Sequence, residues 1–194
     1  MSKTFLQLQD AVDILKLNKD KMLQVSKKKY ATIWAVIFLL VPPLVNLILM
    51  SFSFPSGFGV IFSRFLLWPI FIPALSLAGV LFLASLIAQR SFGGKGKHVG
   101  FFRTVGYSSI ILWITIIPFI LSAFGLMDAL GLFNFISIIA IIWIFAVIYK
   151  MLIIYHLLSQ YDAVFVLVIT FLGYFVLKSI LGRILVGRVY RLLF

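Results

Sequence analysis

The chain alternates long apolar runs with short polar or glycine-containing segments. About 20 apolar residues are needed to cross a hydrocarbon core about 30 Å thick, and five runs approach that length. The pattern therefore predicts an all-α integral membrane protein, a bundle of about five transmembrane helices. The predicted spans are residues 31–52, 64–88, 104–127, 129–150 and 163–182, which together form one membrane domain at 31–182.

The composition supports this class. Hydrophobic residues make up 63% of the 194 residues and charged residues only 11%, and the mean hydropathy is +1.19. Soluble domains lie far from these values. The net charge of +12 does not indicate a nucleic-acid partner, because the cations stand at the edges of apolar runs, where they meet lipid headgroups. Because the chain lacks cysteine, disulfides and thiolate metal sites are excluded.

The segment 1–30 predicts a cytoplasmic amphipathic helix, opened by a capping box at Thr4 and Gln7 and closed by the basic run Lys27, Lys28 and Lys29. The polar side of the helical wheel carries Gln9, Asp13, Lys16 and Asp20, and the apolar side carries Leu8, Ala11, Val12, Leu15 and Met22. Two interpretations fit this pattern. The helix either lies at a membrane or partner surface, with the lysines neutralising anionic lipid at about 1 kcal/mol each, or it is a lid packed under the bundle.

Prolines and small residues mark the predicted spans. Pro42 and Pro43 fall in the middle of span one, which we expect to be kinked. Breaker residues predict a loop at 54–62 and an acidic turn at Asp128. In span two, four small residues recur on one side and predict a helix-packing seam rather than a chemical site. These residues are Ala74, Ala78, Ser85 and Ala88.

A basic, glycine-rich loop is predicted at Gln89–Tyr107, between spans two and three. Positive charge of this kind marks cytoplasmic loops. With the N-terminus in the cytosol, the cytoplasmic segments hold twelve of the seventeen cations. Five crossings then put the basic tail 183–194 outside, against the same tendency. Either the tail is an external interfacial segment, or one span is re-entrant and the C-terminus lies inside.

The run from Gly93 to His98 invites comparison with phosphate-binding loops, but it fits neither GxxxxGK[ST] nor GxGxxG and follows no strand. Two interpretations remain. The loop is either a cationic segment whose amides and lysines meet lipid phosphates or an acidic partner, or a solvated hinge.

Catalysis has few residues to use, since the chain has five aspartates, no glutamate and two histidines. We expect Asp10, Asp13 and Asp20 to be solvated and His156 to be a polar contact at the cytoplasmic end of span four. No catalytic residue, cofactor or metal is predicted, and the protein is expected not to be an enzyme. A membrane enzyme would require His98, His156 and Asp162 to converge.

The segment from Phe92 to Tyr107 resembles the central signature of the Ypt-interacting protein (Yip) domain family, especially its prokaryotic members. The resemblance rests on Gly93-Gly94-x-Gly96, Phe102-Arg103 and Gly106-Tyr107. A second piece, Tyr155-His156-Leu157-Leu158-Ser159 followed by Ala163, is similar to the motif that such proteins carry between spans four and five. The resemblance covers about Phe65 to Gly182. The chain departs from the family in having Ile111 where members often have proline, and Leu66-Leu67-Trp68-Pro69 lacks the acid and glycine of the eukaryotic branch.

The resemblance implies a five-span layout with a cytoplasmic N-terminus, in a prokaryotic plasma (inner) membrane. For the family it implies binding of prenylated GTPases and shaping of internal membranes, but for this chain no Rab GTPase partner. We expect a non-enzymatic scaffold or adaptor that organises membrane or recruits a partner; the alternative is a transporter or channel with a path between proline-kinked helices. Expected partners are the bilayer with its anionic lipids, other membrane proteins or a second copy, and no nucleic acid. The candidate contact residues are Gly93, Gly94, Lys95, Gly96, Lys97, Arg103, Gly106, Tyr107, His156, Lys27, Lys28 and Lys29.

Overall fold

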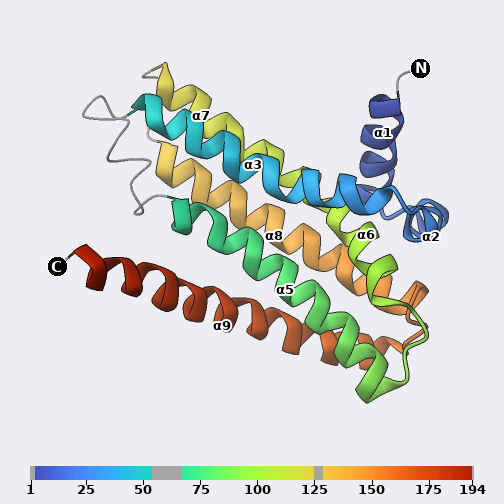
Figure 1. Ribbon diagram of the computed structural model, residues 1–194. Coiled ribbons are helices and arrows are strands. Elements are labelled where there is room, and N and C mark those ends of the chain that lie inside the picture. Colours follow the sequence, from blue (N-terminus) through green and yellow to red (C-terminus); the bar gives the residue numbers. More distant parts are fainter. Residues whose placement is uncertain (1–2, 54–66, 125–128, 194) are drawn as a thin grey trace.

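The computed structural model describes residues 3–53, 67–124 and 129–193, and the regular structure within these ranges is helical (Figure 1). In chain order the elements are α1 (Lys3–Leu15), α2 (Lys19–Lys27), α3 (Ala31–Ser53), α5 (Leu67–Phe92), α6 (His98–Ser108), the 3₁₀ helix η1 (Ser109–Thr115), α7 (Ile116–Ala123), α8 (Ala129–Ile154) and α9 (Gln160–Leu193). The loop predicted at 54–62 and the turn predicted at Asp128 lie outside the described residues.

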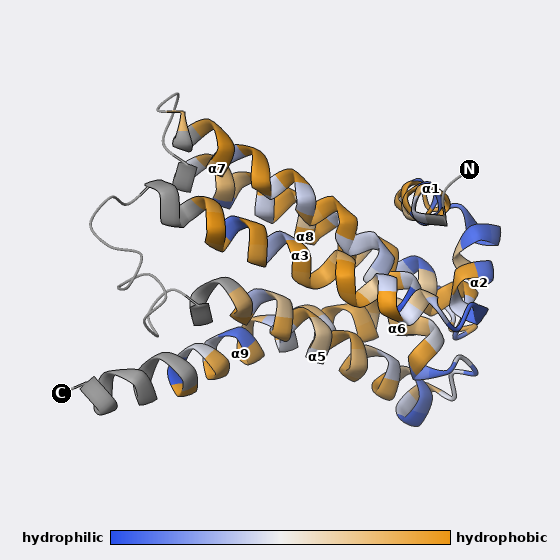
Figure 2. Ribbon diagram, turned by 45° about the horizontal axis from the view of Figure 1, so that its top comes forward, coloured by the Kyte–Doolittle hydropathy of each residue, from blue (hydrophilic) through white to orange (hydrophobic). Residues whose placement is uncertain are grey.

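Within the described ranges, five helical stretches are long and apolar enough to cross a membrane, as the hydropathy pattern predicts. At 1.5 Å per residue, their lengths correspond to about 28 to 38 Å, close to the thickness of a bilayer core. They run side by side, with hydrophobic residues along them and hydrophilic residues gathered at one end (Figure 2). The stretches are Ala31–Leu49, Phe71–Phe92, His98–Leu121, Gly131–Ile154 and Gln160–Ile184.

The helix limits differ from the prediction at two places. The predicted loop Gln89–Tyr107 is mostly helical, because α5 continues through Phe92 and α6 begins at His98, which leaves only Gly93–Lys97, here called the glycine loop. The predicted tail 183–194 is not a separate segment either, since α9 is one helix of 34 residues. The side chains beyond residue 184 lie outside the description.

The third apolar stretch is built from three pieces, α6, η1 and α7, rather than from one regular helix. Just after η1, Pro118 has no N–H to donate to the carbonyl of Ile114, and its ring crowds that carbonyl. Hydroxyl groups at both ends of η1 donate to nearby backbone oxygens: Ser108 Oγ to Val105 O at 2.6 Å and Thr115 Oγ1 to Leu112 O at 2.5 Å. Such side-chain bonds compete with the regular helical pattern.

Small residues bring the helices of the bundle together. A Cβ atom on Gly173 of α9 would lie 3.2 Å from Leu83 of α5, and one on Gly106 of α6 would lie 2.5 Å from the Cβ of Ala35 in α3. The seam predicted in α5 is confirmed in that three of its members are buried and Ala78 is partly buried. One of the three, Ser85, also makes polar contacts, described below.

Helices α1 and α2 form a layer against α6 on one side of the bundle, toward the end that holds the glycine loop, called the loop end here (Figure 1). Hydrogen bonds join the layer to the bundle. Tyr107 Oη donates to Gln7 Oε1 at 2.6 Å, Thr104 Oγ1 to Met22 O at 3.0 Å, and Trp143 Nε1 to Leu15 O at 3.0 Å. These contacts pack the segment 1–30 against the bundle, as the lid interpretation predicts, and they leave Leu8 and Val12 on the outer side of α1 exposed.

The buried face of α1 overlaps the predicted apolar side only in part. Gln7, Asp10, Ala11 and Ile14 are buried, whereas Leu8 and Val12 are exposed. The predicted single helix also breaks after Leu15, where Leu17 adopts a left-handed φ of 57° and Asn18 caps α2 by accepting a bond from Lys21 N. Gln7 contacts Tyr107 instead of closing the predicted capping box.

Asp10 was expected in solvent, and this prediction is wrong, because the residue is only 4% exposed. Its carboxylate accepts bonds from Lys21 Nζ at 2.8 Å and Lys28 Nζ at 2.6 Å. Burial raises the pKa of Asp10, but the hydrogen bonds and charges of the two lysines outweigh burial and hold that pKa below its usual value. The two ion pairs connect α1 to α2 and to the residue that follows it. Lys28 is therefore less available than the neighbouring lysines to bind a lipid or a partner.

Candidate functional site

The glycine loop is fastened to the helices around it. Gly93 turns the chain with a φ of 65°, a conformation that favours glycine. Gly94 N donates to Ala88 O at 2.8 Å, Lys95 N donates to His156 O at 3.1 Å, and Gln89 Nε2 donates to Gly96 O. The loop therefore bonds α5 on one side and the turn between α8 and α9 on the other. These bonds do not fit the solvated-hinge interpretation.

Tyr155 sits against two glycines four residues apart. A Cβ atom on Gly96 would lie 2.5 Å from Cδ1 of its ring, and a Cβ on Gly100 would overlap its Oη atom. The same Oη accepts a hydrogen bond from Lys97 N at 3.2 Å. Only residues without side chains leave this space, so Gly96 and Gly100 are explained by the tyrosine that they contact.

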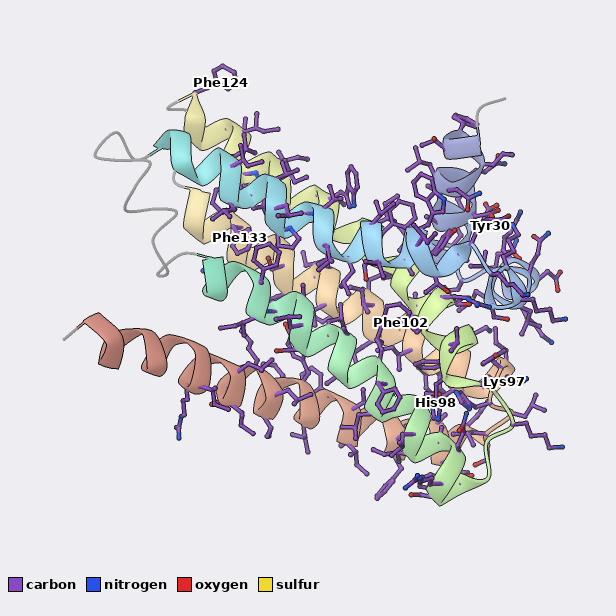
Figure 3. All side chains as sticks on the ribbon, in the orientation of Figure 1. Tyr30, Lys97, His98, Phe102, Phe124 and Phe133 are labelled. Atoms are coloured by element: carbon purple, nitrogen blue, oxygen red, sulfur yellow. The ribbon has the colours of Figure 1, made fainter. Side chains whose placement is uncertain are left out.

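Beneath the loop, Ser85 joins the two histidines of the chain. Its Oγ atom lies 3.0 Å from His156 Nε2 and 3.0 Å from His98 Nδ1. The hydroxyl carries one proton, so it donates to one imidazole and accepts from the other. Phe101 packs beside His156, with ring centroids 5.2 Å apart, and Phe82 packs beside His98 at 5.3 Å. Lys97 and His98 both lie at the loop end in Figure 3.

His156 is 1% exposed. Burial, and secondly the charge of His98, lower the pKa of His156 to about 4, because an imidazolium in this position would lose its hydration. The ring is therefore neutral near pH 7. Its Nδ1 atom has no hydrogen-bond partner among the described residues. Gly94 lies close to that atom, since a Cβ there would be 3.0 Å away.

The third residue named for a catalytic cluster lies elsewhere. Asp162 exchanges hydrogen bonds with Ser159 at the start of α9: Ser159 Oγ donates to Asp162 Oδ2 at 2.6 Å, and Asp162 N donates to Ser159 Oγ at 3.2 Å. This is a helix cap. In the ranges that the structure describes, no group of three His, Asp or Glu residues is placed to hold a metal ion. Ser85 thus links α5 to His98 of α6 and to His156 of the turn between α8 and α9.

The predicted basic contact residues divide into two groups. Arg103 is half-buried and fixed, because its Nε donates to Thr32 Oγ1 at 2.8 Å and its Nη1 to Ser26 O at 3.2 Å. Lys28 is held by Asp10. The others are exposed and make no ion pair within the described part of the chain. They are Lys27, Lys29, Lys95 and Lys97, together with Arg90.

The remaining predicted residues are structural. Gly106 lets α6 approach α3, and Tyr107 is buried with its ring edge-on to Phe38, 5.2 Å between centroids. Near the exposed lysines, an open groove of about 500 Å³ follows α2. It is lined by Asp20, Leu23, Gln24, Lys27 and Lys28.

Sequence reasoning missed Gly100, Tyr155 and Ser85 as site residues. Gly96 and Gly100 have the GxxxG spacing that marks close contacts of membrane helices, and this signal was available. Ser85 was assigned to the packing seam, where its hydroxyl had no visible role. The two segments that carry the family resemblance contact each other through two hydrogen bonds, from Lys95 N to His156 O and from Lys97 N to Tyr155 Oη.

Comparison of the chain with protein-family models, with curated proteins and with the solved structures gave no match. The resemblance to the Yip family rests on the quoted motifs.

Proposed function

We propose that the protein is a multi-pass integral membrane scaffold of the Yip-like type that binds anionic lipid headgroups through the exposed lysines of its loop end. Insertion into a bilayer is supported by the five apolar stretches. Their outward residues are apolar as well, for example Phe82, Ile142 and Val168, which are 57%, 60% and 51% exposed. Apolar surface of this extent is stable only against lipid or another protein.

One observation carries the functional part of the proposal. The backbone of the glycine loop bonds inward, whereas Lys95 and Lys97 are exposed and without ion pairs in the described residues. Their positions are therefore set by the fold, and their charges remain available. Each lysine near an anionic surface contributes about 1 kcal/mol of attraction. The excess of cations at the loop end favours a cytoplasmic location for this end and for the N-terminus, in a prokaryotic plasma membrane.

The Lys95→Gln/Lys97→Gln variant is expected to lose most of the preference for anionic lipid. In detergent, native mass spectrometry would compare binding of phosphatidylglycerol with phosphatidylcholine. Two charges at about 1 kcal/mol each predict roughly a tenfold to thirtyfold weaker preference. The matched control is Lys178→Gln/Arg183→Gln, which removes two exposed cations of α9.

If both variants lose the preference for anionic lipid equally, the lysines contribute only through the total charge of the protein. If neither variant loses this preference, the lipid-binding proposal is wrong. If the loop variant keeps lipid binding but loses a co-purifying acidic protein, the scaffold recruits a protein rather than lipid.

A transporter or channel is the second candidate, and Asn46 favours it. This residue lies in α3, is 4% exposed, and donates from Nδ2 to Thr115 Oγ1 at 3.1 Å, while its Oδ1 has no partner among the described residues. A buried unpaired oxygen inside an apolar span marks a place where water or a solute fits. Solute flux in reconstituted vesicles that is altered by Asn46→Leu would support this function over the scaffold.

A further inference from the structure

Helix α1 presents three different faces. The buried face, Gln7, Asp10, Ala11 and Ile14, packs on the bundle. Beside it runs an apolar stripe formed by Leu8 and Val12, which are 39% and 45% exposed. Gln9 follows Leu8, and Asp13 follows Val12. Each lies about 100° further around the helix than the residue before it, so the two form the polar side. The stripe is thus exposed on a helix whose packing against the bundle is already complete.

The orientation of α1 differs from that of the five apolar stretches. In Figure 1 it stands crosswise to α3 and α8, and after the 45° turn of Figure 2 it is seen nearly along its axis while the long helices still run across the view. A helix placed in this way runs parallel to the plane of a bilayer that the bundle crosses.

The C-terminal end of α1 contacts α8. Leu15, the last residue of α1, accepts a hydrogen bond from the indole of Trp143, which is 40% exposed. Ile139 and Ile142 are exposed on the same helix, at 49% and 60%. At the other side of Leu15, Lys16 and Lys19 are exposed.

We propose that α1 lies in the bilayer interface, with the stripe of Leu8 and Val12 in the boundary between acyl chains and headgroups and with Gln9 and Asp13 toward water. The proposal rests on the membrane insertion proposed above and adds a second lipid contact to it. An interfacial helix of this type needs an apolar face, a polar face and basic residues at the headgroup level. All three are present on α1 and at its end, and Asp10 with its two lysines fixes the helix in place.

The absence of cysteine from the chain allows a direct test with single-cysteine variants of the full protein. Leu8→Cys, Gln9→Cys, Val12→Cys and Asp13→Cys would each carry an environment-sensitive fluorophore in vesicles of phosphatidylcholine and phosphatidylglycerol. Lipids with a quencher high on the acyl chain report contact with the interface, and aqueous iodide reports contact with water. Ile142→Cys serves as the reference for a lipid-facing span and Lys95→Cys as the reference for water.

We expect the labels at 8 and 12 to be quenched by the lipid probe at least threefold more than those at 9 and 13, with the opposite order for iodide. Iodide quenching of all four labels to the level of position 95 would overturn the proposal. Shielding of 8 and 12 from both quenchers would also overturn it, because a second copy or a protein would then cover the stripe. If position 142 is not quenched by lipid, membrane insertion itself fails, which separates the two failures.

Discussion

A Gly100→Ala variant is expected to lose about 2 kcal/mol of folding stability, although alanine normally favours a helix over glycine. The new Cβ atom would overlap Tyr155 Oη and would lie 2.7 Å from Cζ and 3.1 Å from the backbone oxygen of Ser26. Overpacking of this kind typically costs about 1–3 kcal/mol. Tyr155 has little space in which to move aside, since its ring already contacts Gly96. The free energy of unfolding in mixed micelles measures the loss.

Two further variants test the cause. Gly182→Ala adds the same methyl group to α9, where a Cβ meets no atom within 4 Å, so its stability should be unchanged or higher by up to about 1 kcal/mol. Tyr155→Phe removes the overlapping Oη atom and should restore part of the stability of Gly100→Ala, although alone it loses the bond from Lys97 N. If Gly100→Ala is as stable as Gly182→Ala, the tyrosine does not occupy the space between the glycines.

Helix α6 also shows why sequence reasoning placed the helix ends wrongly. Gly100 was placed in the predicted glycine-rich loop, and Gly106 fell both in that loop and in the predicted span 104–127. In α6 both are helical, and each leaves space for a specific neighbour, Tyr155 or Ala35. The number and approximate positions of the apolar stretches could be predicted, because they depend only on the length of each hydrophobic run.

Asp10 shows why the sequence alone could not predict the surroundings of a charged residue. Its partners stand 11 and 18 residues away, beyond the turn at Leu17. A helical wheel compares residues within one helix, so it could not show that α2 folds back and brings two lysines to this carboxylate. The contacts of Ser85 could not be predicted for the same reason, because the two histidines that it contacts come from two other parts of the chain.

Lowering the pH from 7 toward 4 is expected to reduce the free energy of unfolding by up to about 3 kcal/mol through His156. The pKa of this residue falls from 6.5 to about 4 on folding, chiefly because of burial and secondly because of the charge of His98. The unfolded chain therefore binds a proton near pH 6.5, but the folded chain does so only near pH 4. The stability is complete above pH 6.5 and is lost as the pH falls through this window. At about 1.4 kcal/mol per pKa unit, the shift gives the stated size.

The slope of stability against pH, measured for the wild type and for His156→Gln, isolates this residue even if the variant starts from a lower value. His98 of α6 is the other titratable group in contact with Ser85, and a His98→Gln variant shows how much it contributes. The pKa of Asp10 is held below its ordinary value of 3.8, so the loss of its ion pairs falls below the window. We expect a nearly flat profile between pH 6.5 and 4 for His156→Gln. If His156→Gln keeps the wild-type slope of stability against pH, the proton uptake that causes the slope occurs at another group. The imidazole of His156 would then be protonated in the folded protein despite its burial.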